Sequence, residues 1–320
     1  MLQPPDMKLW CGRIDSDEGI LGQRWHQIAR PVTQAVERGA TLVGFISDVG
    51  VSRNQGRPGA KHAPGFIRSM LANLPVRVCR DIFDAGNVVC EAGALEEAQD
   101  ELAGLVAKLL SKGLFPVILG GGHEVAYGSF SGLGQHLKDD SNPPSIGIIN
   151  LDAHFDLRME TFASSGTPFR QMADYCTASN WAFNYCCLGV SEFSNTDALF
   201  ARAKELGVLW RRDEDMELNK LDKLLSTLGN FMDSVDHLYL TICLDVLPAS
   251  VAPGVSAPAA RGVPLEVIEP IIDTVCASGK LRLADLAELN PEKDIDQRTA
   301  RVAARLVARI IEGGTVRSVD

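Results

Sequence analysis

Short apolar runs rich in β-branched residues alternate along the chain with segments of helical periodicity. The runs end in glycine or in a polar group, which is typical of buried strands. The clearest runs are ATLVGFIS, FPVILGGG, SIGIINLDAH, FNYCCLGV, HLYLTICLDV and KLRLADLAELN. Between them, apolar residues recur every three or four positions, which predicts helices. The predicted helices span residues 95–112, 195–206, 217–232, 265–277 and 296–312.

This alternation predicts an α/β fold of three layers, in which helices cover both faces of a mostly parallel sheet. The chain has no internal repeat. Its loops richest in proline, glycine and serine, residues 50–65 and 248–264, interrupt the pattern without separating two cores. We therefore predict a single domain over residues 1–320, a length that can bury a large core.

Composition and charge exclude several classes of partner. A net charge of −10 argues against binding a nucleic acid through the whole surface. There is no run of eighteen apolar residues and no secretory signal pattern, so we expect no membrane association and a cytoplasmic location. The eight cysteines include no C-x-x-C pair, which predicts that most are buried thiols.

Groups that bind metals or catalyse reactions follow four of the predicted strands. In an open parallel sheet the ligand site lies at the carboxyl ends of the strands, so these groups are expected to meet there. They are His123 and Glu124, then Asp152, His154 and Asp156, then Cys243 and Asp245, and finally Glu288.

The DAHFD segment is the strongest local motif. Alternate residues of an extended segment point the same way, so Asp152, His154 and Asp156 would share one face. Histidines combined with carboxylates favour Mn²⁺, Zn²⁺ or Fe²⁺ over Ca²⁺. An alternative interpretation is that the aspartates cap the next element and that His154 is a core histidine.

The other strand ends also allow structural interpretations. The glycines before His123 suggest a phosphate cradle, but no Gly-Lys-Ser/Thr follows and the G-x-G-x-x-G spacing is absent. Asp245 and Glu288 are residues that commonly bond loop amides at the ends of strands. Their position beside the histidines favours a role in the site, and Glu288 suits a cationic amidine substrate.

The segments GGGHE, DAHFD and CLD resemble the GG-x-H, DAH-x-D and D-x-D segments of the ureohydrolase family, which comprises arginases, agmatinases and formimidoylglutamases. The resemblance to formimidoylglutamases extends along nearly the whole chain. It includes RNQGRPGAKHAPGFIR, NLDAHFDLR, SSGTPFRQ, LPASVAPGVSAPAARG and AELNPEKDIDQRTARVAARL. It implies an arginase-like catalytic domain that hydrolyses N-formimidoyl-L-glutamate to L-glutamate and formamide in histidine degradation.

The resemblance also implies a dinuclear Mn²⁺ site. By motif, His123 and Asp156 would bind one ion, His154 and Asp245 the other, and Asp152 would bridge both. The family has a second bridging aspartate where this chain has Cys243. Two interpretations of Cys243 are open: a thiolate ligand, which would weaken the preference for Mn²⁺, or a buried thiol that leaves the site partly filled.

For the reaction, the resemblance implies that Asp156 transfers a proton and that Glu288 holds the cationic NH groups of the substrate. The two carboxylates of the substrate need donors with the fork geometry of arginine. The candidates are Arg57, Arg158 and Arg170, each of which is also compatible with a surface or structural role.

Two other functions remain open. One is hydrolysis of a different small substrate, namely a guanidino acid, agmatine or arginine, although the chain lacks a histidine that arginases carry in the loop after DAH-x-D. The other is a metal-poor, weakly active homologue that results from Cys243. The resemblance further implies a homo-oligomer, either a trimer or a hexamer.

Overall fold

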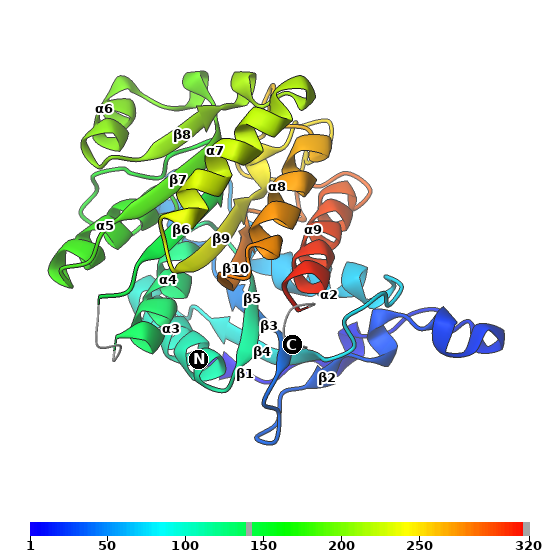
Figure 1. Cartoon of the computed structure of the whole chain (residues 1–320). Helices are drawn as coiled ribbons and strands as arrows, with labels where there is room; N and C mark the ends of the chain where they lie inside the picture. The colour runs from blue at the N-terminus through cyan, green and yellow to red at the C-terminus, as the bar shows by residue number, and fades with distance from the viewer. Residues whose placement is uncertain (139–142, 316–320) are drawn as a thin grey trace.

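The computed structural model describes residues 1–138 and 143–315, and a ten-stranded sheet forms its centre (Figure 1). The strands are β1 (Leu2–Gln3), β2 (Arg30–Pro31), β3 (Gly39–Ile46), β4 (Ile82–Val89), β5 (Leu114–Leu119), β6 (Ile146–Leu151), β7 (Asn184–Val190), β8 (Leu209–Arg212), β9 (His237–Cys243) and β10 (Leu281–Ala287). Their order is β1-β4-β3-β5-β10-β9-β6-β7-β8, and β2 also pairs with β4. Among the described strands every pairing is parallel except that of β1 with β4.

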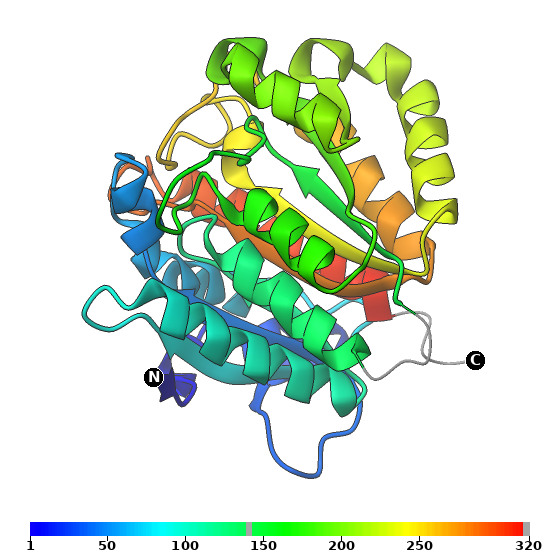
Figure 2. The same cartoon turned by 90° about the vertical axis from the view of Figure 1, so that its left-hand side faces the viewer.

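Helices cover both faces of this sheet. They are α1 (Val49–Arg53), α2 (Ala63–Ala72), α3 (Leu95–Ser111), α4 (Val125–Leu137), α5 (Pro168–Ala178), α6 (Asp197–Glu205), α7 (Leu221–Asp233), α8 (Leu265–Ala277) and α9 (Arg298–Thr315). Helices α3, α4 and α5 pack on one face, and α2, α7, α8 and α9 pack on the other (Figures 1 and 2). The predicted three-layer α/β/α fold is therefore confirmed.

All six predicted strands and all five predicted helices are present, but several elements were not predicted. Helix α4 is one of them, because its glycines and serines obscure the apolar pattern. Gly132 is required by packing, since a Cβ there would lie 2.6 Å from Cβ of Val106 on α3. Helix α2 was missed because it begins inside the loop predicted over residues 50–65, with Pro64 in its first turn.

Strand β4 was missed because its pattern contains a buried charge. Asp84 is fully buried and accepts two hydrogen bonds of 2.8 Å from the guanidinium of Arg68 on α2. The indole of Trp10 donates a third hydrogen bond, of 2.9 Å, to the same carboxylate. This buried ion pair fixes α2 against the sheet.

Helices α8 and α9 are joined by ion pairs along their outer surface. Arg305 and Arg309 of α9 both pair with Glu269 of α8, and Arg309 also pairs with Asp273. These contacts lie within the chain and satisfy much of the arginine-rich face of α9. None of the helices in the described part of the chain is long and apolar enough to span a membrane.

Candidate metal centre

The predicted ligands come together because the strands before them are neighbours in the sheet. Strands β5, β10, β9 and β6 lie side by side, and their carboxyl ends share one edge. His123 follows β5, Glu288 follows β10, and Asp152 follows β6. Cys243 is the last residue of β9 and Asp245 lies in the turn after it. Segments from residue 114 to residue 288 thus contribute to one site.

The glycines before His123 allow the chain to pass close to its neighbours. A Cβ at Gly121 would lie 1.8 Å from the carbonyl oxygen of Ser47, and one at Gly122 would lie 2.0 Å from Glu124 Oε2. Any other residue would push His123 away from the sheet edge. The backbone N–H of His123 also donates a 3.0 Å hydrogen bond to Glu288 Oε1, so the two strand ends are tied together.

The side chains form two groups with a shared member. Donor atoms of His123, Asp152 and Cys243 lie within 4.8 Å of one another, and so do those of Asp152, His154 and Asp245. Asp156 lies beside the first group, because its Oδ2 is 3.0 Å from His123 Nδ1. Asp152 belongs to both groups, which is the position of a bridging ligand.

Buried polar atoms without a hydrogen bond suit the binding of a cation. Asp245 Oδ1 and Glu288 Oε2 are buried and make no hydrogen bond within the described residues, whereas buried polar atoms normally have a partner. His123 Nδ1 faces the carboxylates of Asp152 and Asp156, each at 3.0 Å. Imidazole, carboxylate and thiol donors suit a divalent transition metal rather than Ca²⁺. Three aspartates and a thiolate would also balance the charge of two divalent cations.

Charge interactions shift the pKa values of the histidines. Burial disfavours the charged form of His123, but the adjacent carboxylates of Asp152 and Asp156 outweigh it and raise its pKa well above the usual range. Burial opposes the charge of His154 in the same way, and Asp245 and Asp152 raise its pKa. A cation that binds these nitrogens must displace protons, so metal binding should be coupled to proton release.

Asp156 and Glu288 occupy an unusual backbone region. Their φ angles are 48° and 72°, in the left-handed region that non-glycine residues seldom adopt. Burial, then the charge of Asp152, raises the pKa of Asp156 to about 6. Burial, then the charges of Glu124 and Asp245, raises the pKa of Glu288 to about 8. Backbone strain and crowded carboxylates are both typical of functional sites.

Cys243 lies among the ligands rather than behind them. Its side chain is buried, and its sulfur belongs to the group of His123 and Asp152. Burial and the neighbouring carboxylates raise its pKa well above the usual range. The thiol is therefore placed to bind a cation, and only a cation would favour its ionised form.

The ligands open into a pocket of about 320 Å³, which is within the usual range for a small substrate. Arg57 and Arg158 both line it. The guanidinium of Arg57 donates to the carbonyl oxygens of Ser256 and Val255, so it is partly used within the chain. Within the described residues the guanidinium of Arg158 makes no hydrogen bond or ion pair, which leaves it the better placed of the two.

The third predicted arginine lies elsewhere. Arg170 is on α5, where it pairs with Asp174 one turn along the helix, and it does not line the pocket. Its position in the SSGTPFRQ segment placed it near the metal ligands in sequence, but helix α5 begins at Pro168 and directs it to another surface. Arg170 is therefore not part of the site that the structure brings together.

Other polar residues of the pocket were not predicted. They include Asn54, Ser165 and Asn195, which come from three different loops. Asn195 holds the DAHFD segment, because it accepts from the N–H of Phe155 and donates to the carbonyl oxygen of Ala153. No periodic pattern in the sequence marks these residues, since loop contacts depend on the folded path of the chain.

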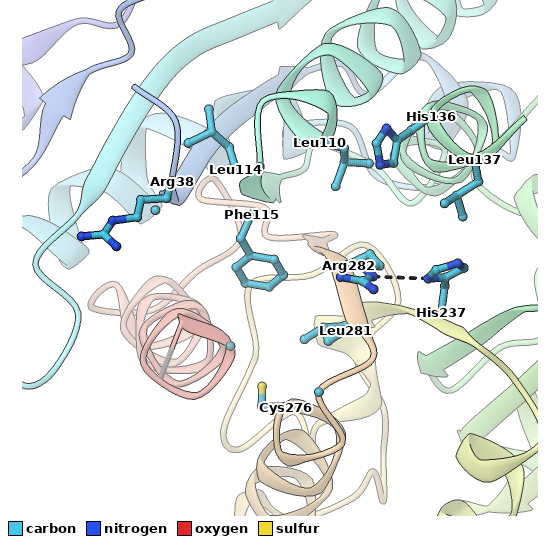
Figure 3. Close-up of a pocket in the computed structure, with 14 residues that line it drawn as sticks. Arg38, Leu110, Leu114, Phe115, His136, Leu137, His237, Cys276, Leu281 and Arg282 are labelled. Atoms are coloured by element: carbon cyan, nitrogen blue, oxygen red, sulfur yellow. Dashed lines mark hydrogen bonds between the residues drawn. The ribbon is translucent and has the colours of Figure 1, made fainter. Parts of the chain in front are cut away.

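A larger hollow of about 500 Å³ lies at the opposite, amino ends of the strands (Figure 3). Arg38, Arg282, His136 and His237 line it, together with the glycines that follow α3 and α8. Helices end there, and basic side chains complement the partial negative charge of helix carboxyl termini. In the described part of the chain, no group of metal-ligating residues lies in this hollow.

Comparisons with known proteins agree with this fold and show the family. A family model described as the arginase family matches residues 38–312. The formimidoylglutamase of Ralstonia nicotianae is 60% identical over 311 residues, which is 96% of each chain. The crystal structure of formimidoylglutamase from Bacillus subtilis has a TM-score of 0.79 at 23% identity and covers 89% of this chain and 90% of that one. Formiminoglutamase from Trypanosoma cruzi with Mn²⁺ has a TM-score of 0.74 at 23% identity, over 98% and 100% of the two chains.

Proposed function

Since this chain belongs to the arginase family, we propose that it hydrolyses N-formimidoyl-L-glutamate to L-glutamate and formamide with two Mn²⁺ ions. The observation that carries the proposal is the pair of ligand groups that share Asp152, at the base of a pocket lined by Glu288 and Arg158. The name formimidoylglutamase, carried by relatives 60% and 56% identical to this chain, supports the choice of substrate. The Mn²⁺ bound to the Trypanosoma cruzi enzyme supports the choice of metal.

Six residues would hold the two cations in this proposal. His123, Asp156 and Cys243 would bind one ion, His154 and Asp245 the other, and Asp152 would bind both. When bound, two such cations lower the pKa of water and so supply a nucleophile at neutral pH. Glu288 is left to act on the substrate, because its Oε2 has no partner and its Oε1 is already held by His123.

Different residues of the pocket would bind the substrate and transfer protons. Glu288 would accept hydrogen bonds from the cationic formimidoyl group, and such charge-assisted bonds fix its orientation. Asp156 would take a proton from the attacking water and return it to the departing nitrogen. Arg158 would bind a carboxylate of the glutamyl portion, with Arg57 on the same side of the pocket.

The substrate is tested by following product release from three compounds. Purified protein supplemented with Mn²⁺ is given N-formimidoyl-L-glutamate, arginine or agmatine, and formamide, urea and amine products are measured. We expect formamide from the first compound only. Urea from arginine or agmatine would instead support the alternative amidinohydrolases.

A matched pair of variants tests the ligands. Asp245→Ala removes a proposed ligand at the carboxyl end of β9, whereas Asp236→Ala changes an exposed carboxylate next to the amino end of the same strand. The first should abolish activity and the second should retain it.

If wild-type protein binds no Mn²⁺ and releases no product, the metal-poor homologue is the better interpretation. The homo-oligomer implied by the resemblance and the cytoplasmic location expected from the sequence remain part of this proposal.

A further inference from the structure

A row of buried polar side chains crosses four neighbouring strands just below the proposed ligands. Asp285 on β10 is in register with Thr241 on β9, Thr241 with Asn150 on β6, and Asn150 with Cys187 on β7. Each of these four residues is fully buried. We call Asp285, Thr241, Asn150 and Cys187 the polar row; its strands adjoin one another in Figure 1.

The polar row lies directly beneath the ligands. Residues two apart in a strand point to the same face, and Cys243 and Asp152 stand two residues after Thr241 and Asn150. Helices α3 to α5 cover this face, and Tyr239 Oη on it lies 3.3 Å from the carbonyl oxygen of Ala126 on α4. The row therefore occupies the layer between the proposed metal centre and the apolar core.

Three members of the polar row contact residues that are proposed metal ligands. Thr241 Oγ1 is 3.0 Å from His123 Nε2, and Asn150 Nδ2 donates a 3.0 Å hydrogen bond to Asp152 Oδ2. The thiol of Cys187 lies 3.3 Å from the carbonyl oxygen of His154. The fourth member, Asp285, accepts a 2.5 Å hydrogen bond from Tyr239 Oη.

Stability alone does not account for these polar residues. The surrounding strand positions are leucine, isoleucine and tyrosine, and an apolar side chain would avoid the cost of burying polar atoms. Asn150 Oδ1 and Asp285 Oδ1 have no hydrogen-bond partner in the described residues. A buried polar atom without a partner lowers stability, so a role in the site explains these side chains better than packing does.

We propose that Thr241 and Asn150 are positioning residues for the metal centre, an inference that rests on the proposed metal-dependent function. In this arrangement Thr241 Oγ1 accepts the Nε2 proton of His123, so that Nδ1, the nitrogen next to Asp152 and Asp156, is the one that would bind a cation. Asn150 holds one oxygen of Asp152, and the backbone N–H of His154 holds the other at 2.7 Å. Both ligands are thus oriented before a cation arrives.

The chain offers a matched control for this proposal. Thr41 on β3 is also fully buried in the sheet, but its Oγ1 makes no hydrogen bond within the described residues. Thr241→Val and Thr41→Val make the same change of shape and chemistry, and only the first removes a contact with a ligand. Thr241→Ser keeps the hydroxyl and is the rescue variant.

The test measures Mn²⁺ affinity by calorimetry on metal-free protein, with the unfolding midpoint of each metal-free variant alongside. We expect Thr241→Val to bind Mn²⁺ about 10–100-fold more weakly, as is usual when a partner of a ligand is removed. Thr241→Ser and Thr41→Val should bind like wild type. The metal-free midpoints of the two valine variants should agree within about 2–4 °C.

Asn150→Leu provides an independent arm, because it should weaken Mn²⁺ binding while it leaves the metal-free protein folded. Wild-type affinity in both Thr241→Val and Asn150→Leu would overturn the positioning role and leave the proposed function standing. Equal losses in Thr241→Val and Thr41→Val would also overturn it, since a general packing effect would then be responsible. Failure of wild-type protein to bind Mn²⁺ would overturn both proposals.

Discussion

Cys243 determines what kind of donor atom the first ligand group offers to a metal ion. A thiolate offers one soft sulfur atom, whereas the aspartate that the family resemblance implies for this position would offer two hard oxygens, which Mn²⁺ prefers. The side chain is buried within the first ligand group, so the identity of its donor atom should change the affinity for the metal ion.

We predict that Cys243→Asp raises Mn²⁺ affinity by about tenfold or more and also raises turnover. Calorimetry and formamide release are the measurements. Cys276→Ser is the control, because this buried thiol lies near Ile310 of α9, away from the site. Unchanged metal affinity and rate in Cys243→Asp would mean that position 243 does not contact the metal.

Mutation of Glu288 should lower catalytic activity without weakening the binding of Mn²⁺. Glu288→Gln keeps an oxygen that can accept from the N–H of His123 but cannot ionise, whereas the carboxyl of Glu288 would be negatively charged beside bound cations and an amidinium group. A hydrogen bond to a charged group is worth about 1.5–3 kcal/mol, which corresponds to roughly a 10–150-fold lower kcat/KM. Mn²⁺ affinity measured on the same preparation should stay near that of wild type; a parallel loss of metal would make Glu288 a ligand instead.

Site residues were predictable from the sequence where a metal-binding or ionisable side chain directly follows the apolar run of a strand. His123, Asp152 and Cys243 stand out because they follow apolar runs. Thr241 and Asn150 are single polar residues inside such runs, and their meaning depends on the register between strands, which the sequence does not reveal. Arg170 shows the opposite problem, since it is near the ligands in sequence but turned away by α5.

At the scale of elements, α2 is held to β4 by the ion pair between Arg68 and Asp84, which is buried away from water. Arg68 is 2% exposed and Asp84 is 0% exposed in this ion pair. Loss of one partner would leave the other charge buried and unpaired, which is far more costly than loss of a surface pair.

We predict that Arg68→Met lowers the free energy of unfolding by about 3–5 kcal/mol. Urea unfolding followed by circular dichroism gives the value. Asp81→Asn is the matched control, because it disrupts the exposed Arg30–Asp81 pair and should cost less than about 1 kcal/mol. Similar values for both variants would show that Asp84 is compensated in some other way.

The ion pairs between α8 and α9 should make stability depend on acid pH. The hydrogen bond from Arg305 lowers the pKa of Glu269 in the folded chain below its ordinary value of 4.5. A lowered folded-state pKa adds stability above the unfolded-state pKa, and this contribution is lost as the pH falls through the folded-state value.

Glu269→Gln should therefore be less stable than wild type at neutral pH, by roughly 0.2–1 kcal/mol for a partly exposed pair. The difference should shrink as the pH falls below about 4.5. Urea titrations across this range are the measurement. Glu266→Gln, an exposed change on the same helix, should show no such trend, and a constant difference for Glu269→Gln would contradict the assignment.

Elements with regular apolar spacing were predictable, and those shaped by tertiary contacts were not. Helix α8 was predicted at its observed bounds because apolar residues recur along one face. Strand β4 and helix α4 escaped prediction because Asp84 and Gly132 are explained only by their partners on other elements. The spacing of apolar residues indicates which positions are buried. The close packing of two helices at a glycine, and the pairing of a buried charge, depend on residues far away in the chain.

For the whole molecule, metal binding should stabilise the folded chain. A ligand that binds only the folded state adds about 2.7 kcal/mol at 100 times its Kd. We predict that Mn²⁺ raises the unfolding midpoint and that EDTA reverses the rise, as measured by differential scanning fluorimetry. Ca²⁺ should give a smaller shift, because the site contains nitrogen and sulfur donors. No shift with Mn²⁺ would contradict the proposed metal centre.

The order of strands has a consequence for how the protein is made. Strands β5 and β6 are consecutive in the chain but are separated in the sheet by β9 and β10, which emerge from the ribosome much later. His123 and the DAHFD segment therefore cannot reach their final distance until β10 has been inserted between its neighbours. A nascent chain would lack the first ligand group, which contains His123, until β10 is in place, whereas the second group needs only β6 and β9. Metal uptake at the first group would therefore mark the end of folding rather than guide its beginning.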